Sequence, residues 1–283
     1  MTSPRLDPRT TPATERVALD SLRGVLDRPG YTAGTPMRVA VPLAELCRLP
    51  GGARDRQLNF GTDVLVIDDG RADGWVFVQR VQDGYCGWTT GAALSDRLPP
   101  LTHRVSAPAT HLYPAPDMKT HQIFVLSIGA RLSVEGIEGA FARLATGGYV
   151  PVQHIIDHDE DDPAAVALRL VGTPYLWGGN SDWGIDCSGL VQAALWACGI
   201  PCPGDTDLQR AAGVAVEGEP RPGDLLFWPG HVAMVIDGGR MVHANGHAMA
   251  VTIEGIEAAK ARIEAAGEGP CLGARRFERP AKT

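Results

Sequence analysis

The sequence predicts an α+β unit at the carboxyl end of the chain, preceded by two small all-β units. Short apolar runs divided by glycine and aspartate extend from Met37 to Leu98, and a second β-rich stretch covers residues 101–154. After Pro163, two helical segments precede four strand-like runs, an order typical of an α+β fold. We therefore expect an arm over residues 1–30, β-rich units over 31–98 and 99–158, and an α+β unit over 159–283.

Composition excludes several classes of partner. The 283 residues carry a net charge of −7, and only 6% of them are aromatic. A negative chain is poorly suited to bind phosphate backbones or anionic lipid, and so few aromatics leave no stacking platform for single strands. No apolar run approaches the roughly 18 residues of a membrane helix, and the first residues do not resemble a signal peptide. We expect no nucleic-acid or membrane partner and a cytoplasmic location; the sequence specifies no oligomeric state.

Cysteine and acidic residues could indicate a metal or a disulfide scaffold. The six cysteines are spread along the chain without a CxxC pair, which favours reduced thiols. The acidic run His158–Asp162 could be a metal-binding loop. A solvated linker in which Asp162 caps a helix starting at Pro163 is the stronger interpretation. We expect no metal and no cofactor.

The amino-terminal half divides at its turn signals. In the arm, Val17, Leu22 and Leu26 could share one face of a short helix over Glu15–Leu26. Asp83-Gly84 is a hairpin signal between two β-prone runs in the first β-rich unit. In the second, the expected strands are Gln122–Ile128, Arg131–Glu135, Phe141–Leu144 and Tyr149–Val152.

The carboxyl-terminal unit begins with helices. Ala164–Val171 reads as one helix, and Cys187–Cys198 as a second that stops at Gly199. Gly238-Gly239 marks a hairpin. The expected strands are Asp224–Trp228, His231–Ile236, Arg240–Ala244 and Ala250–Ile253.

Cys187 is the candidate nucleophile. A helix amino terminus lowers the pKa of a thiol and offers N–H groups to an oxyanion, and the polar flank of Cys187 disfavours a core role. A nucleophilic thiol also needs a base. His231 and His243 lie on consecutive expected strands, where one ring can orient the other. His247 lies in a glycine-flanked loop and is a weaker candidate, and we take Cys198 and Cys202 as structural.

Five motifs in the carboxyl-terminal unit carry a resemblance. In order they are Thr173–Gly179, Gly184–Val191, Pro222–Phe227, Gly230–Val235 and Met241–Ala244. Together, over about residues 163–277, they resemble the NlpC-type cell-wall peptidases, a papain-like family of cysteine peptidases. Gly74-Trp75 and Asp83–Trp88 resemble the bacterial SH3-like barrels found ahead of such peptidases. The second SH3-like barrel is inferred mainly from strand spacing.

The resemblance implies a catalytic set. Cys187 would be the nucleophile, His231 the general base and acid, and His243 the residue that orients His231. Tyr175 would help the backbone N–H of Cys187 to stabilise the oxyanion. The family needs no metal or cofactor.

The resemblance also implies a substrate. The family cleaves the γ-D-glutamyl to diamino acid bond of peptidoglycan stem peptides. Relatives with SH3-like barrels resemble enzymes that require a free L-alanine amine, which an acidic residue must pair. Many of them carry arginine where this chain has Gly204, and Asp205 could instead be a turn residue. The implied substrate-binding residues are Asp186, Ser188, Asp205, Thr206 and Tyr85, although Tyr85 could equally be a surface aromatic of the barrel.

These expectations converge on the recycling of free L-Ala-γ-D-Glu-diamino acid peptides. Two other functions remain open. An amidase or acyltransferase could use the same Cys-His-His set on another acyl group. Alternatively, the barrels could bind wall peptides while the peptidase unit is inactive, although the intact Cys187, His231 and His243 argue against that.

Overall fold

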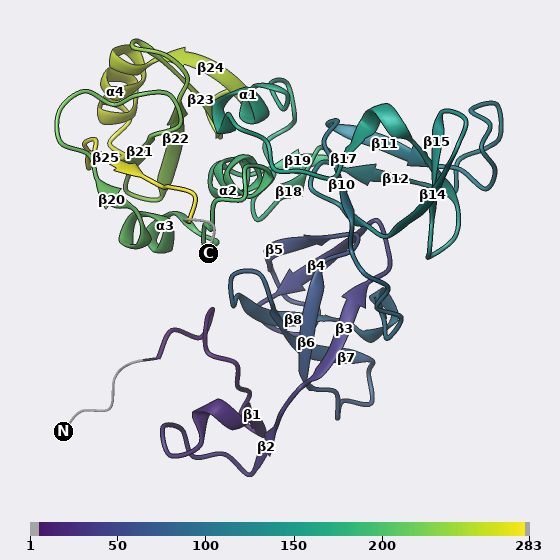
Figure 1. Ribbon diagram of the computed structural model, residues 1–283. Coiled ribbons are helices and arrows are strands. Elements are labelled where there is room, and N and C mark those ends of the chain that lie inside the picture. Colours follow the sequence, from purple (N-terminus) through teal and green to yellow (C-terminus); the bar gives the residue numbers. More distant parts are fainter. Residues whose placement is uncertain (1–5, 281–283) are drawn as a thin grey trace. The chain divides into compact units, whose positions relative to one another are not determined.

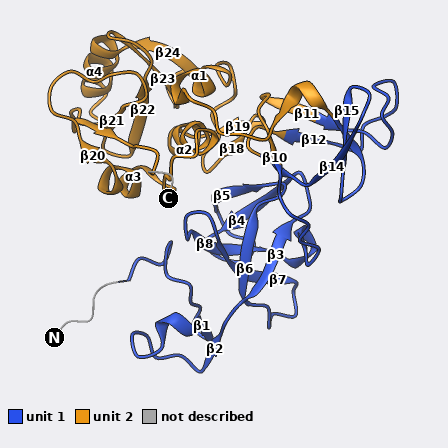
Figure 2. Ribbon diagram, in the orientation of Figure 1, with its two compact units in different colours: residues 1–102, 111–126, 130–150 blue, residues 103–110, 127–129, 151–283 orange. Residues whose placement is uncertain are grey.

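A computed structural model describes residues 6–280 and is mostly β, with few helices (Figure 1). The chain divides into two compact units (Figure 2). Unit 1 holds the residues up to 102 together with 111–126 and 130–150, and unit 2 holds 103–110, 127–129 and the residues from 151 onward. The four helices of the described part are α1 (Pro163–Leu168), α2 (Cys187–Ala197), α3 (Thr206–Ala212) and α4 (Ile256–Ala265).

Most of unit 1 is a seven-stranded sheet in the order β5-β4-β8-β7-β6-β3-β9. Its strands are β3 (Thr35–Val39), β4 (Leu43–Cys47), β5 (Arg54–Asn59), β6 (Asp63–Asp68), β7 (Trp75–Arg80), β8 (Cys86–Thr90) and β9 (Leu94–Ser95). The expected Asp83-Gly84 turn is confirmed, because it joins the antiparallel pair β7 and β8 and Gly84 has a φ of 75°. Leu46, Val78 and Tyr85 lie in the core of this sheet.

The arm is not helical over Glu15–Leu26, so that prediction is wrong. β1 (Val17–Leu19) pairs in parallel with β2 (Gly30–Thr32), and only the three residues Asp20–Leu22 form a 3₁₀ turn, η1. The strand ladder uses the backbone groups that a helix would need, and Gly24, at φ 78°, interrupts the segment.

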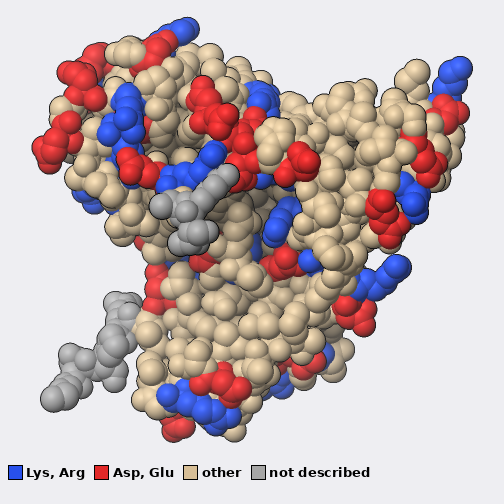
Figure 3. All heavy atoms as spheres, viewed as in Figure 1, with Lys and Arg blue, Asp and Glu red and all other residues tan. Residues whose placement is uncertain are grey.

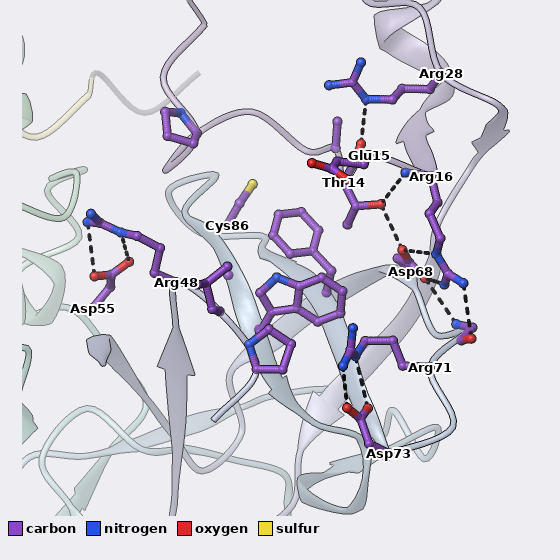
Figure 4. A pocket seen from close by; sticks show the side chains of 18 of the residues that line it. Thr14, Glu15, Arg16, Arg28, Arg48, Asp55, Asp68, Arg71, Asp73 and Cys86 are labelled. Atoms are coloured by element: carbon purple, nitrogen blue, oxygen red, sulfur yellow. Dashed lines mark hydrogen bonds and ion pairs between the residues drawn. The ribbon is translucent and has the colours of Figure 1, made fainter. Parts of the chain in front are cut away.

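The arm and the sheet border a cavity of about 860 Å³ (Figure 4). Phe77 and Trp88 line it with edge-to-face rings whose centroids are 5.3 Å apart. Arg16 of the arm pairs with Asp68 of β6, and the Thr14 hydroxyl donates to the same carboxylate at 2.8 Å. These polar contacts fasten the arm to the sheet.

The second β-rich stretch forms several small sheets. β14 (Val134–Glu138), β15 (Phe141–Leu144) and β16 (Tyr149–Pro151) make one three-stranded sheet. Each of the four expected segments contains a strand, so their positions are confirmed. The other elements are β10 (His103–Val105), β11 (Ala109–Leu112), β12 (Phe124–Ser127), β13 (Arg131–Leu132), η3 (Val152–His154) and β17 (Ile155–Ile156); a 3₁₀ turn, η2 (Gly91–Ala93), lies earlier, between β8 and β9.

Unit 2 is built around a six-stranded sheet in the order β20-β25-β21-β22-β23-β24. Its strands are β20 (Val214–Ala215), β21 (Leu225–Trp228), β22 (His231–Val235), β23 (Arg240–Asn245), β24 (Ala250–Gly255) and β25 (Ala274–Arg276); β18 (Asn180–Ser181) and β19 (Gly184–Ile185) form a separate hairpin. Both predicted helices and the four predicted strands are thus confirmed to within a few residues at their ends.

Alternation along the strands gives the sheet of unit 2 two apolar faces. Phe227, Val232 and Met234 pack with α1 and α2 in one core cluster. Leu226, Val235 and their neighbours pack with α4 in another. The helices therefore cover both faces of the sheet, and α2 is fixed by complete burial of its apolar side.

Asp162 starts α1 as expected. Its carboxylate accepts the backbone N–H of Ala164 at 2.9 Å, and Pro163 occupies the first turn. Within residues 6–280, His, Cys, Asp and Glu side chains form no group of three or more that could hold a metal ion. In the same range, no helix has the length and apolarity needed to cross a membrane. On the face shown in Figure 3, acidic and basic side chains are intermixed.

Candidate active site

Cys187 is the first residue of α2, and Asp186 fixes the start of that helix. The Asp186 carboxylate accepts the N–H of Gly189 at 2.6 Å and the hydroxyl of Ser188 at 2.9 Å through one oxygen. Its other oxygen accepts the N–H of Gly178 at 3.0 Å. Asp186 therefore caps the helix and ties the preceding loop to it.

Close packing around this helix start requires glycine. A Cβ on Gly189 would lie 2.3 Å from the carbonyl oxygen of Gly179. No side chain fits at that distance without displacing backbone, so the glycine lets the loop approach the first turn of α2. The three hydrogen bonds to Asp186 and this approach leave little freedom for the position of Cys187.

The Cys187 thiol is 6% exposed and faces two other segments. Its sulfur lies 3.8 Å from the hydroxyl oxygen of Thr206 and 3.9 Å from the carbonyl oxygen of Gly230. Burial, and then the Asp186 carboxylate, raise the pKa of Cys187 to about 11, while the Thr206 hydroxyl and the N–H of Val232 act in the opposite direction. At neutral pH the thiol needs a nearby base to become a nucleophile.

His231 lies at the start of β22, between Gly230 and Val232, the two residues whose backbone acts on the Cys187 sulfur. Nε2 of His231 is 2.9 Å from Nδ1 of His243, on the adjacent strand β23. Met234 of β22 lies opposite Val242 of β23. In this register His231 and His243 are diagonal neighbours on the two strands, and their rings can therefore meet. One hydrogen bond therefore joins the two rings, and Nδ1 of His231 is not used in it.

Burial lowers the pKa of both histidines, to about 3 for His231 and about 4 for His243. His231 is therefore neutral at physiological pH and can accept a proton. A proton that moves from Cys187 to His231 creates two opposite charges, and their attraction offsets part of the cost of burying each. A thiol and two imidazoles are the kinds of group that can serve as a nucleophile, a base and an orienting residue.

Tyr175 also lies at this site. Burial, then the proximity of Cys187 and Asp186, raise the pKa of its phenol. The phenol is therefore protonated and can donate a hydrogen bond to a developing oxyanion. Its backbone N–H donates to Met249 at 2.9 Å, which anchors the segment before α2.

Asp205 and Thr206 approach the site at the start of α3. Thr206 is in direct contact with the Cys187 sulfur, and Asp205 is its neighbour in the chain. Asp205 has φ 58° and ψ 142°, a backbone conformation that non-glycine residues rarely adopt, and its side chain makes no capping bond to the helix. Strain of this kind is typical of functional positions.

The remaining predicted residues have different surroundings. The hydroxyl of Ser188 is a donor to Asp186. Tyr85 belongs to unit 1, where its ring is 1% exposed within the core of the seven-stranded sheet. A ring buried in this way presents no face to a ligand.

Sequence reasoning missed Glu254 on β24 and Arg262 on α4. Oε2 of Glu254 lies 3.2 Å from Nε2 of His243, and Arg262 binds the same carboxylate. The expected strand ends at Ile253, two residues too early, because glutamate and glycine are disfavoured in strands. The alternation that places Thr252 opposite His243 could have identified Glu254, two residues further along the strand.

Comparisons with known proteins agree with this geometry. Residues 172–262 match the model of the NlpC/P60 family, and residues 46–94 match that of the bacterial dipeptidyl-peptidase Sh3 domain. The chain is 30% identical over 216 residues to a gamma-D-glutamyl-L-lysine dipeptidyl-peptidase of Bacillus subtilis (strain 168), covering 66% of this chain and 71% of that protein. It is 29% identical over 224 residues to a protein of the same name from Bacillus cereus, covering 67% of each.

A solved structure resembles the fold. The NlpC/P60 family protein from Bacillus cereus ATCC 10987 matches with a TM-score of 0.72 and 23% identity. The match covers 85% of this chain and 99% of that one.

Proposed function

This chain belongs to the NlpC/P60 family of cysteine peptidases, and we propose that it hydrolyses the γ-D-glutamyl to diamino acid bond of peptides derived from peptidoglycan. The observation that carries the proposal is the Cys187 sulfur at the start of α2, next to the carbonyl of Gly230, which precedes His231 on β22, and the hydrogen bond of His231 to His243 on β23. The similar Bacillus proteins are named for the γ-D-glutamyl-L-lysine bond, which supports this substrate class.

The proposed reaction proceeds through a thioester. His231 takes the thiol proton, and the Cys187 sulfur attacks the γ-carbonyl carbon of the D-glutamyl residue. The backbone N–H of Cys187 and the phenol of Tyr175 stabilise the oxyanion. His231 then protonates the leaving amine, the C–N bond breaks and the diamino acid departs.

Water completes the cycle. His231 removes a proton from the water molecule as its oxygen attacks the thioester carbonyl carbon. The C–S bond breaks, the dipeptide leaves with a new carboxylate, and the sulfur recovers a proton from His231. His243 holds the ring of His231 in place through both steps.

We assign recognition of the free L-alanine amine to Asp205, with Thr206 beside it. The strained backbone of Asp205 and the contact of Thr206 with the Cys187 sulfur support this choice. Asp186 is a poorer candidate, because it already accepts from Gly189, Ser188 and Gly178. Tyr85 is left out of the proposed site because its ring is buried.

We further infer a domain order of an arm (1–30), two SH3-like barrels (31–98 and 99–158) and a papain-like peptidase domain (159–283). The match of residues 46–94 to an Sh3 domain supports the first barrel. The small sheets of the second stretch support the second. Cytoplasmic recycling of free peptides completes the proposal, supported by the six free thiols, which a reducing compartment maintains.

Mass spectrometry tests the proposed substrate. The protein is incubated with L-Ala-γ-D-Glu-L-lysine, with the diaminopimelate analogue, and with N-acetylated forms of both. Release of the diamino acid from the free-amine peptides alone supports the proposal. Cleavage of acetylated peptides removes the amine requirement, and cleavage of none favours an amidase, an acyltransferase or an inactive binding module.

A further inference from the structure

Glu254 holds a fixed position beside the histidine pair. Glu254 lies on β24, and Arg262 lies on α4, the helix that directly follows this strand. The guanidinium binds both carboxylate oxygens, Nε to Oε1 at 3.0 Å and Nη2 to Oε2 at 2.7 Å. Two parallel hydrogen bonds of this kind fix the plane of the carboxylate as well as its distance.

The carboxylate faces the far side of His243. Oε2 of Glu254 is 3.2 Å from Nε2 of His243, a ring that is completely buried. The angle lies outside good hydrogen-bond geometry, and within the described residues Nε2 has no other hydrogen-bond partner. A buried ring nitrogen without a partner is destabilising, so the approach of this oxygen is the means of satisfying it.

The direction of the hydrogen bonds follows from the role of His231. To accept a proton from Cys187, Nδ1 of His231 must be bare, so the ring proton lies on Nε2 and is donated to Nδ1 of His243. His243 must then carry its own proton on Nε2, directed at Glu254. The opposite tautomer of His243 would leave its lone pair facing a carboxylate and would reverse the chain.

We propose that Glu254, anchored by Arg262, is a positioning residue that fixes the tautomer of His243 and stabilises the protonated form of the histidine pair. This inference rests on the catalytic roles proposed above for Cys187, His231 and His243. The arrangement extends the chain of polar groups from the nucleophile to the surface of unit 2.

The charges around the pair agree with this role. Burial lowers the pKa of His243. The charge and hydrogen bonding of Glu254 raise this pKa, and the charge of Arg262 lowers it. Burial, then the charges of His243 and Arg262, lower the pKa of His231, and the charge of Glu254 raises it. Burial, then the charge of Asp186, raise the pKa of Cys187. Hydrogen bonds from Arg262 keep the pKa of Glu254 below its usual value, so the carboxylate is charged at neutral pH.

The test measures the nucleophile and needs no substrate. The rate of carbamidomethylation of Cys187 by iodoacetamide is followed by peptide mass spectrometry from about pH 5 to pH 10. Wild type, Glu254→Gln and Arg262→Gln are compared, with Glu257→Gln as the control. Glu257 is on the same helix, 85% exposed, and pairs only with Lys260 among the contacts of its side chain in residues 6–280.

The two variants separate electrostatics from structure because both break the same ion pair. Glu254→Gln removes the negative charge, and we expect the rate at pH 7 to fall about tenfold, equal to one pKa unit, with the profile moved to higher pH. Arg262→Gln removes the anchor but leaves the charged carboxylate beside His243, and we expect a smaller fall in rate, to within about threefold of wild type. Glu257→Gln is expected to match wild type.

An equal fall in both variants, or an unchanged rate in Glu254→Gln, overturns the inference in favour of a purely structural ion pair. If Glu254→Gln does not fold, a tenfold fall in the alkylation rate of Arg262→Gln is enough to overturn the inference. Failure of the proposed substrate would leave these rates unaffected. A wild-type Cys187 that reacts no faster than the other five cysteines would overturn both the inference and the proposed catalytic role.

Discussion

The hydroxyl oxygen of Thr206 lies 3.8 Å from the sulfur of Cys187, although the two residues begin different helices. The contact links α3 to the first turn of α2 at the reacting atom. It lowers the pKa of a thiol that burial otherwise raises. Thr206 thus acts on the thiol of the proposed nucleophile.

Replacing Thr206 by valine tests this contact. Valine keeps the shape and removes the hydroxyl, so the thiolate loses one hydrogen bond of about 1 kcal/mol. We expect the rate of alkylation of Cys187 at neutral pH to fall about fivefold, the equivalent of that energy. Thr206→Ser, which retains the hydroxyl, is the control and should stay near wild type; equal effects of the two variants would argue against the contact.

Cys187→Ala separates chemistry from binding. Removal of the sulfur abolishes thioester formation, and we expect peptide turnover to fall by at least about a thousandfold. Affinity for the free-amine peptide, measured by titration calorimetry, should remain within a few-fold of wild type because the proposed amine contact is elsewhere. Unchanged turnover would exclude Cys187 as the nucleophile. Cys271→Ala, at a partly exposed thiol outside the site, is the matched control.

Much of this site could be predicted from local sequence. The start of α2 is specified by Asp186, Ser188 and Gly189, whose hydrogen bonds to one another span no more than three residues in the chain. The pairing of His231 with His243 follows from a hairpin. Local sequence patterns are therefore sufficient to predict the candidate nucleophile and its candidate base.

Contacts between distant segments could not be predicted in this way. The approach of Thr206 to Cys187 depends on how α3 packs against α2, and Tyr85 is buried by the tertiary packing of its sheet. The helix predicted for the arm is wrong because the same spacing of apolar residues also suits a short strand when a partner strand, Gly30–Thr32, is available. Tertiary pairing overrides the local preference there.

Asp205 is predicted to discriminate free from blocked amines. Asp205→Asn removes the charge that would pair with an ammonium, and we expect KM for the free-amine peptide to rise about tenfold or more with little change in kcat. N-acetylation removes the ammonium at the alanine end, so turnover of the acetylated peptide should stay as low in the variant as in wild type. Asp207→Asn, an exposed neighbour on α3, is the control. A fall in kcat alone, with selectivity intact, would place amine recognition elsewhere.

The last prediction concerns the arm and its dependence on pH. Burial opposes the charge on Asp68, but hydrogen bonds from Arg16 and Thr14 outweigh it and hold the pKa of the carboxyl below its usual value. A depressed folded pKa means that this stabilisation is complete above the unfolded pKa of about 3.9 and is lost as the pH falls through the folded value.

Asp68→Asn should release the arm without unfolding the chain. Loss of a buried charged partner costs about 1–3 kcal/mol, so amide hydrogen exchange in β1 and β2 should speed up about tenfold or more at neutral pH. The difference from wild type should shrink below about pH 4, where wild type also loses the charge. Asp69→Asn, at an exposed neighbour, is the control. A difference between Asp68→Asn and wild type that persists unchanged in acid would show that the side chain acts through its shape and not its charge.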